Sequence, residues 1–297
     1  MQFIVRTPSQ QVYSFMHLKH RYHFNDTNVR DLEKKELGYI GEVIADELIH
    51  AHFGNDACIY LTDLNYIINY TQVQIDSILI IENTLYIFEV KYFNFDLTYD
   101  GELYYLANGE VLHSLNNQLE KIKKLMRSVF EYKVDDIIVK PFFTNKDQKI
   151  YAKHADHYLT MHNYKAFFNS IEKPKFYNQA VAAELIQMRK PNDFDKPLEI
   201  RYHEVEKGTY CPDCFHKLEK SSERKYQCTQ CDKIFTSRMI IEQSFKDLPI
   251  LFPNIVITTP LLYDWFGGQM SDRNLRRYLK LHKTEHPFKL IHKKSNC

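Results

Sequence analysis

The chain has 297 residues, with 39 Lys and Arg against 38 Asp and Glu and a formal net charge of +1. This length accommodates two or three domains, and the near balance of charge excludes a protein that is polycationic over its whole surface. The first residues lack the charged and then apolar layout of a signal peptide, and no apolar run approaches the length of a membrane span. We therefore expect a cytoplasmic protein that has no membrane partner.

The first predicted element is a helix over residues 31–53, which follows an N-terminal extension, residues 1–30, without an assigned function. Apolar residues recur at helical spacing in this segment, and Gly54 is placed to end it. Glu42 lies close to this apolar stripe, and a strand over 58–64 is predicted next. The stripe consists of Leu37, Ile40, Ile44, Leu48 and Ile49.

Two strongly apolar segments, residues 74–81 and 85–91, predict a hairpin of two mostly buried strands with a two-residue turn between them. Strand side chains alternate between faces, so Glu89 and Lys91 point the same way. The register of such a turn sets Asp76 opposite Glu89. Adjacent carboxylates on an apolar sheet are costly unless a cation lies between them, and a hard divalent ion with oxygen ligands meets that need. A cross-strand salt bridge of Lys91 on a solvated face is the alternative.

The elements that follow complete the first domain. Residues 112–129 predict an amphipathic helix, and residues 136–143 predict another buried strand. Lys121 and Lys124 on the helix would either meet phosphates or face water. With helices before and after the strands, residues 31–173 are expected to form a mixed α/β domain.

Four motifs in this order resemble the nuclease-related domain, NERD, of the PD-(D/E)XK nuclease superfamily. The resemblance covers roughly residues 30 to 150. It rests on Gly41-Glu42 in the first helix, Gln74-Ile75-Asp76-Ser77-Ile78-Leu79 and Ile87-Phe88-Glu89-Val90-Lys91 in the hairpin, and Asn117-Gln118-Leu119 in the later helix.

The resemblance implies a restriction-endonuclease-like mixed sheet flanked by helices. It also implies that Asp76 and Glu89 bind catalytic Mg²⁺ or Mn²⁺ and that Lys91 positions the attacking water. Glu42 would add an acidic metal ligand, with an ordinary surface glutamate as the alternative. Gln118 would hold the substrate backbone or the catalytic strand, with capping or solvent exposure as the alternative.

A linker and a small metal module are expected next. Residues 174–209 hold a helical piece and a polar segment with two prolines, which is typical of a linker. Two Cys-x-x-Cys pairs with thirteen residues between them then predict a zinc ribbon over residues 210–236. Four thiolates leave no open coordination position, so the Zn²⁺ would be structural, and a redox dithiol is the alternative. The predicted ligands are Cys211, Cys214, Cys228 and Cys231.

Residues 237–297 predict a helical module. Two helices around Gly267-Gly268, the second with Ser271 as its N-cap, resemble a helix-turn-helix, although many such helix pairs bind nothing. Residues 271–297 carry eight Lys and Arg against two Asp and Glu, which indicates either contact with nucleic acid or a solvated helix end. The residues expected to contact nucleic acid here are Arg273, Arg276 and Arg277.

Together these features predict a metal-dependent nuclease, a phosphodiester hydrolase that acts on DNA. In this hypothesis the zinc ribbon and the helix-turn-helix hold the substrate. Two other functions share the motifs: a non-catalytic DNA-binding or scaffold protein on a nuclease fold, and an RNA-directed nuclease. The complete set of Asp76, Glu89 and Lys91 favours the enzyme, because a retired site has no need of all three.

Overall fold

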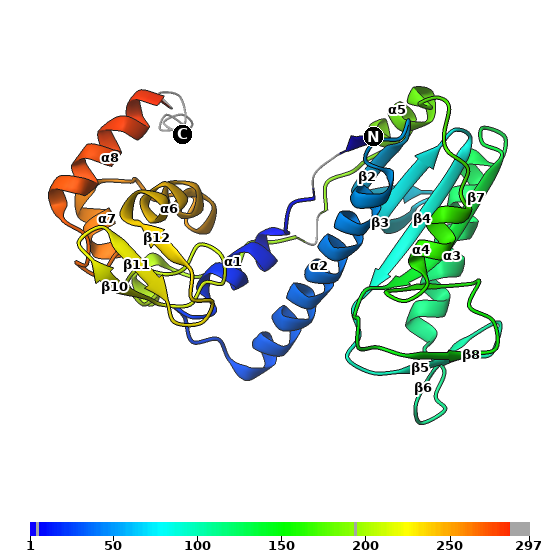
Figure 1. Cartoon of the computed structure of the whole chain (residues 1–297), viewed down its shortest axis with the longest axis horizontal. Coiled ribbons are helices and arrows are strands. Elements are labelled where there is room, and N and C mark those ends of the chain that lie inside the picture. Colours follow the sequence, from blue (N-terminus) through cyan, green and yellow to red (C-terminus); the bar gives the residue numbers. More distant parts are fainter. Residues whose placement is uncertain (4–5, 193–194, 286–297) are drawn as a thin grey trace. The chain divides into compact units, whose positions relative to one another are not determined.

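The structure, a computed structural model, describes residues 1–3, 6–192 and 195–285 (Figure 1). It divides into two compact units, one of Met1–Pro8 with Glu33–Phe194 and one of Ser9–Leu32 with Asp195–Cys297. The expected N-terminal extension contributes to both units, and so does the expected linker. The domain boundaries predicted from the sequence therefore remain a prediction. No helix in the described ranges is long and apolar enough to cross a bilayer.

The first unit is built on a six-stranded mixed sheet with the order β1-β2-β3-β4-β7-β9. Strands β2, β3 and β4 are antiparallel neighbours, whereas β7 runs parallel to β4, β9 parallel to β7, and β1 parallel to β2. The strands are β1 (Gln2–Phe3), β2 (Ile59–Ile68), β3 (Thr71–Ile81), β4 (Thr84–Lys91), β7 (Asp136–Phe143) and β9 (Leu159–Thr160).

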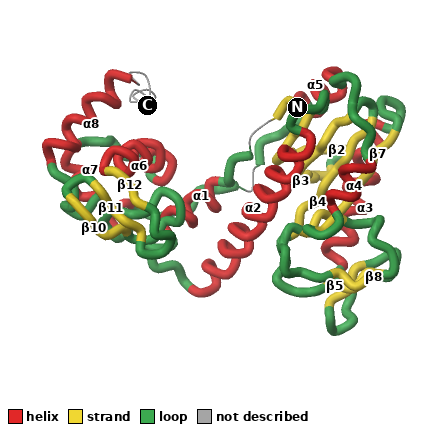
Figure 2. Tube along the Cα trace, in the orientation of Figure 1, coloured by secondary structure: helices red, strands yellow, loops and turns green. Residues whose placement is uncertain are grey.

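Helices cover both faces of this sheet, as the tube in Figure 2 also shows. Helices α2 (Asp26–Phe53) and α4 (Tyr164–Ser170) pack on one face, and α3 (His113–Phe130) and α5 (Gln179–Gln187) pack on the other. Burial on both sides explains why the central strands are almost continuously apolar. This mixed sheet flanked by helices confirms the predicted fold class. On β3, Leu79 and Ile81 face α2, whereas Ile78 and Ile80 face α3.

The central hairpin forms with the predicted turn. Paired residues run from Ile81–Thr84 to Ser77–Phe88, and Glu82 in the turn has a left-handed φ of 50°. This register brings Asp76 and Glu89 to the next position along the hairpin. A second sheet of three short strands lies in the same unit: β5 (Leu97–Tyr99), β6 (Tyr104–Leu106) and β8 (Ile150–Ala152).

In its described residues, the second unit combines a three-stranded antiparallel sheet with four α-helices and one 3₁₀ turn. Helices α7 and α8 confirm the two predicted C-terminal helices, and Ser271 caps the second one by accepting from the Asn274 N–H at 3.4 Å. Residues 286–297 of the predicted basic tail lie outside the described residues. The elements are α1 (Gln10–Leu18), η1 (Tyr202–Glu204), β10 (Leu218–Ser222), β11 (Lys225–Cys228), β12 (Ile234–Thr236), α6 (Ser237–Leu251), α7 (Thr259–Trp265) and α8 (Asp272–Glu285).

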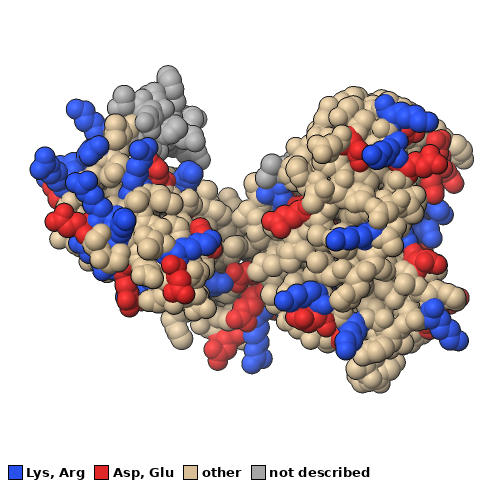
Figure 3. Space-filling view, viewed as in Figure 1, with Lys and Arg blue, Asp and Glu red and all other residues tan. Residues whose placement is uncertain are grey.

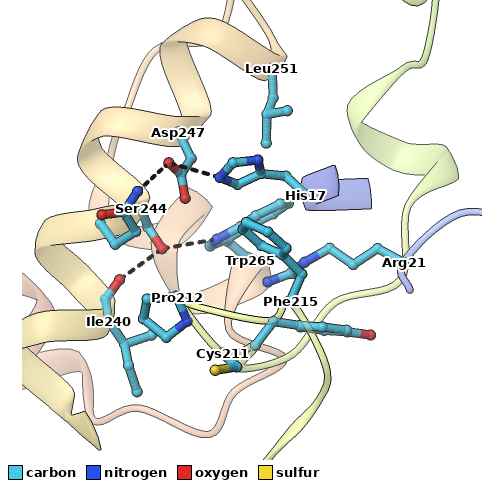
Figure 4. A pocket seen from close by; sticks show the side chains of 12 residues that line it. His17, Arg21, Cys211, Pro212, Phe215, Ile240, Ser244, Asp247, Leu251 and Trp265 are labelled. Atoms are coloured by element: carbon cyan, nitrogen blue, oxygen red, sulfur yellow. Dashed lines mark hydrogen bonds and ion pairs between the residues drawn. The ribbon is translucent and has the colours of Figure 1, made fainter. Parts of the chain in front are cut away.

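Residues from the expected N-terminal extension are built into the core of this second unit. The guanidinium of Arg21 lies over the rings of Tyr210 and Trp265, at 3.7 and 4.0 Å from their centroids. Figure 4 shows Arg21 next to Trp265. His17 approaches the carboxylate of Asp247 on α6, with Nε2 at 3.5 Å. Helix α1 and the turn after it therefore help to stabilise the helices and the cysteine-rich loops, a role that the sequence did not reveal.

Candidate active site and cysteine cluster

Asp76, Glu89 and Lys91 come together at one end of the central hairpin. The Val90 N–H donates to Asp76 Oδ2 at 2.7 Å. The Asp76 side chain thus links β3 to β4 just beyond Ser77–Phe88, where the paired part of the hairpin ends. Lys91 Nζ donates to Glu89 Oε1 at 2.5 Å and to Gln118 Oε1 on α3 at 3.2 Å. Four of the predicted catalytic residues thus form one connected group.

The strands are distorted at this group. Ile75 and Ile78 on β3 belong to the same core cluster although they are three residues apart, so the alternation of side chains slips around Asp76. On β2, Asp63 has a left-handed φ of 51° and lies between the pairs Thr62–Ser77 and Leu64–Ile75. Backbone irregularities of this kind re-aim side chains, and here they turn Asp76 toward the end of β4.

The α2 side of the site carries a network that the sequence did not reveal. Arg6 Nη1 donates to Glu42 Oε2 at 2.6 Å, and Arg6 Nε donates to Asp46 Oδ2 at 2.8 Å. A further bond from Arg6 Nη2 reaches the backbone carbonyl of Asp76 at 2.8 Å. Asp46 also accepts the hydroxyl of Tyr60 at 2.6 Å. Glu42 is therefore brought to the site, but with Arg6 as its immediate partner.

Burial and neighbouring charges set the protonation of this group. Burial, reinforced by the negative charge of Asp76, raises the pKa of Glu89, and the same two causes raise the pKa of Glu42 even though Arg6 opposes them. Burial alone lowers the pKa of Lys91, but the carboxylates of Glu89 and Asp76 outweigh it and raise that pKa. The raised pKa favours the ammonium form of Lys91.

The donor set fits a hard divalent cation. Glu89 is 1% exposed, and its Oε2 accepts no hydrogen bond, which is costly for an ionised buried carboxylate unless a cation fills the place; without the cation, a proton shared with Asp76 relieves the cost. Asp76 beside it is also buried, at 7% exposure. Carboxylate oxygens, water and a phosphate oxygen are the ligands that Mg²⁺ prefers. Asp76 and Glu89 are thus the residues that would hold such an ion.

Gly41 lets α2 approach the site closely. A Cβ built on Gly41 would lie 2.8 Å from Thr144 Oγ1 and 2.8 Å from the Cβ of Tyr92. Thr144 directly follows β7, and its N–H donates to the carbonyl of Lys91 at 3.0 Å. The lack of a side chain at residue 41 therefore sets how near Glu42 comes to the catalytic strands.

We expect Gly41→Ala to destabilise the first unit by about 1–3 kcal/mol, because the added methyl group overpacks this contact. Gly38→Ala, one turn earlier on the same helix, is the matched control. Nothing lies within 4 Å of a Cβ at Gly38, so that change should stabilise by up to about 1 kcal/mol through helix propensity. Thermal unfolding and hydrogen exchange of α2 check both values. Equal effects of the two substitutions would contradict the close approach at Gly41.

The four cysteines of the second unit form a compact cluster. Their sulfur atoms all lie within 4.8 Å of one another, and no other such group of three or more His, Cys, Asp or Glu residues occurs in the described part of the chain. Cys211 and Cys231 are 3.8 Å apart, and Cys214 and Cys228 are 3.3 Å apart. Ligands about 2.3 Å from a tetrahedral Zn²⁺ would be separated by about 3.8 Å, so the cluster can hold that ion.

The two cysteine loops are built alike. In each loop the residue after the second cysteine, Phe215 or Asp232, has a left-handed φ, and its N–H donates to the carbonyl of the first cysteine at 3.0 Å. Burial opposes ionisation of Cys228, but backbone N–H groups outweigh it and lower its pKa to about 7. The zinc-ribbon prediction is confirmed as a fold: two matched loops on a small antiparallel sheet.

The predicted nucleic-acid contacts lie on two helices. Lys121 and Lys124 are exposed on α3, and Lys121 Nζ donates to the backbone carbonyl of Gln72 at 2.6 Å. In the second unit, Lys and Arg side chains gather around α8 (Figure 3). The predicted residues there are exposed, but Arg276 is paired with Asp272 at 2.7 Å, which leaves Arg273 and Arg277 as the stronger candidates.

Comparison with known proteins supports the resemblance seen in the sequence. Residues 37–144 match the family model of the nuclease-related domain, NERD, which confirms that prediction for this segment. No curated protein matched the chain. A solved structure, the crystal structure of protein of unknown function AF1548, is similar over 51% of this chain and 77% of its own, with 10% identity and a TM-score of 0.26.

Proposed function

We propose that the chain is a metal-dependent nuclease that hydrolyses phosphodiester bonds of DNA at the Asp76, Glu89 and Lys91 site. The observation that carries the proposal is the partnerless Oε2 of the buried Glu89, next to the Asp76 carboxylate and 2 residues from a charged lysine. The match of residues 37–144 to a nuclease-related family supports it. A cross-strand ion pair alone would leave that buried oxygen unexplained.

Each residue has a distinct part in the proposed reaction. Asp76 and Glu89, helped by the Val90 carbonyl, would hold a Mg²⁺ or Mn²⁺ ion, which would supply a nucleophilic water and stabilise charge on the phosphate. Lys91, kept positive by the two carboxylates, positions the attacking water and donates to the phosphate as negative charge develops. Gln118 accepts a hydrogen bond from Lys91 and so fixes where the ammonium points.

The other basic residues and the cysteine cluster are proposed to hold the DNA. Lys121 and Lys124 on α3 would contact the phosphate backbone, since Gln118 on the same helix reaches the site. The second unit would carry a structural Zn²⁺ and present Arg273 and Arg277 of α8 to the duplex, with Arg276 held by Asp272.

The test is cleavage of supercoiled, linear and single-stranded DNA by wild type and by Lys91→Ala, with Mg²⁺, Mn²⁺ or EDTA present. We expect cutting that requires the divalent ion and falls by about 10²–10³-fold in the variant, because a charge aimed at the transition state is lost. Circular dichroism and zinc content serve as controls and should not change.

Two outcomes would point to the other functions. DNA binding without cutting under every condition, with Lys91→Ala indistinguishable from wild type, would favour a non-catalytic scaffold on a nuclease fold. Competition by RNA, with cleavage of RNA and not of DNA, would favour an RNA-directed nuclease. The two outcomes differ in whether any phosphodiester bond is broken.

A further inference from the structure

Arg6 is placed as a fixed cation inside the candidate active site. The residue is 8% exposed, and four hydrogen bonds engage its guanidinium: one to Glu42, two to Asp46 and one to the carbonyl of Asp76. Burial alone lowers the pKa of Arg6, but the hydrogen bond to Asp46 and the charge of Glu42 outweigh it and raise that pKa. The planar fork of arginine suits such a bidentate arrangement, which a lysine does not reproduce.

This arrangement divides the carboxylates of the site into two sets. Both oxygens of Asp46 accept from Arg6, and Oδ1 also accepts from Tyr60, so Asp46 is fully engaged. Glu42 gives one oxygen to Arg6 at 2.6 Å. Within the described residues, neither Asp76 nor Glu89 forms an ion pair with Arg6. Glu89 is paired with Lys91 and keeps one oxygen that accepts no hydrogen bond. The carboxylates on α2 are thus engaged by a fixed cation of the protein, whereas Asp76 and the second oxygen of Glu89 remain for a metal.

We infer that Arg6 is a positioning residue that takes the place of a second metal ion. It pairs with Glu42 and Asp46 and holds the backbone of Asp76, so that Asp76 and Glu89 would bind one divalent cation. A second ion on the α2 side would need the oxygens that Arg6 occupies, and its charge would lie against the guanidinium. The inference rests on the proposed function for its role in cleavage, but the number of bound ions does not.

The first test counts Mn²⁺ by electron paramagnetic resonance and calorimetry on the zinc-loaded full chain. We expect wild type to bind one Mn²⁺, and two ions of similar affinity would overturn the inference. In Arg6→Gln the freed carboxylates should admit a second, weaker Mn²⁺. Arg30→Gln, an exposed arginine on α2, is the matched control and should keep one ion. Unchanged Mn²⁺ binding by a folded Arg6→Gln variant would likewise overturn it.

A second pair of variants keeps the test informative if Arg6→Gln does not fold. Arg6→Lys retains the charge and should still bind one Mn²⁺. Its single ammonium cannot bridge Glu42 and Asp46, so kcat should fall by about 10-fold while KM for DNA changes little. Added guanidinium should raise the kcat of Arg6→Ala by at least about 10-fold and return the number of bound Mn²⁺ ions to one. Added methylammonium should change neither quantity. Failure of guanidinium to change either quantity in the folded variant would contradict the role.

Failure of the proposed function is distinguishable from failure of this inference. A wild-type protein that cuts no nucleic acid, yet binds one Mn²⁺ and gains a second in Arg6→Gln, would retain Arg6 as the fixed cation of a non-catalytic metal site. A wild-type protein that cuts DNA with two bound ions would support the proposed nuclease function and contradict the proposed role of Arg6.

Discussion

Glu89→Gln is expected to abolish metal-dependent cleavage while making the metal-free first unit more stable. The substitution removes one of the two carboxylates that would hold the ion, and a loss of about 10³-fold or more in kcat follows if the metal supplies most of the catalysis. It also replaces a buried carboxyl group, whose ionisation the fold tolerates only at a cost, by a neutral amide of the same shape, so the gain in stability is expected near and above the raised pKa of Glu89. Activity and stability should therefore move in opposite directions.

The raised pKa of Glu89 determines whether the stability of the first unit rises or falls with pH. The pKa of a glutamate in an unfolded chain is about 4.3. In the folded chain, burial and the charge of Asp76 raise the pKa of Glu89 to about 8. Between these values the folded state binds a proton that the unfolded state does not, so stability falls as pH rises. The contribution is fully present below the unfolded pKa and is lost as pH passes through about 8.

Hydrogen exchange of β3 and β4 peptides in EDTA, from pH 5 to pH 8 after correction for intrinsic rates, measures the effect. Wild type should lose on the order of 2 kcal/mol of protection over this range, and Glu89→Gln should lose much less. Adding Mn²⁺ should restore wild-type protection and leave the variant unchanged. Glu172→Gln, at an exposed position, is the control and should behave as wild type. A Glu89→Gln profile parallel to that of wild type would contradict the raised pKa.

The hairpin shows how much of the site the sequence could predict. Its apolar run, its two-residue turn and the alternation of strand side chains are local properties, and they were sufficient to bring Asp76, Glu89 and Lys91 together. Gln118 was singled out only by the resemblance to the nuclease-related domain, whereas the regular period predicted the helix that carries it, which spans 18 residues in the structure. The same argument gave the cysteine cluster, since the spacing of thiolates within each pair is itself local.

Arg6 is a residue of the candidate site that local sequence patterns did not predict. Its partners lie 36, 40 and 70 residues away, on α2 and β3, and nothing in the polar and aromatic first residues indicates that they enter the site. The left-handed backbone at Asp63 is equally a product of packing, since aspartate at that position has no neighbouring glycine or turn motif to signal it. Long-range ion pairs and slips in strand alternation depend on how elements meet, which periodicity does not encode.

Removal of the proposed Zn²⁺ from the four cysteines is expected to unfold the second unit and spare the first. Cys211 and Cys228 belong to one core cluster with Leu18 of α1, Phe245 of α6 and Trp265 of α7. Apparent binding free energies of structural Zn²⁺ are about 10–16 kcal/mol, more than the whole stability of a typical small domain. Without the ion, the four buried or half-buried thiols lose the interaction that holds the two loops together.

Cys228→Ser, or strong chelation of the wild type, should therefore abolish zinc binding and protection from hydrogen exchange in α1, α6 and α7. Peptides of α3 and β7 should stay protected, because their cores share no residue with the cysteine cluster. Cys58→Ala is the matched control: this isolated cysteine is buried in the first unit, so its loss should loosen that unit and leave the zinc content unchanged. Protection of α1 and α6 in Cys228→Ser without bound zinc would contradict this prediction. The apolar core would then be sufficient to stabilise this unit, and the ion would serve a purpose other than stability.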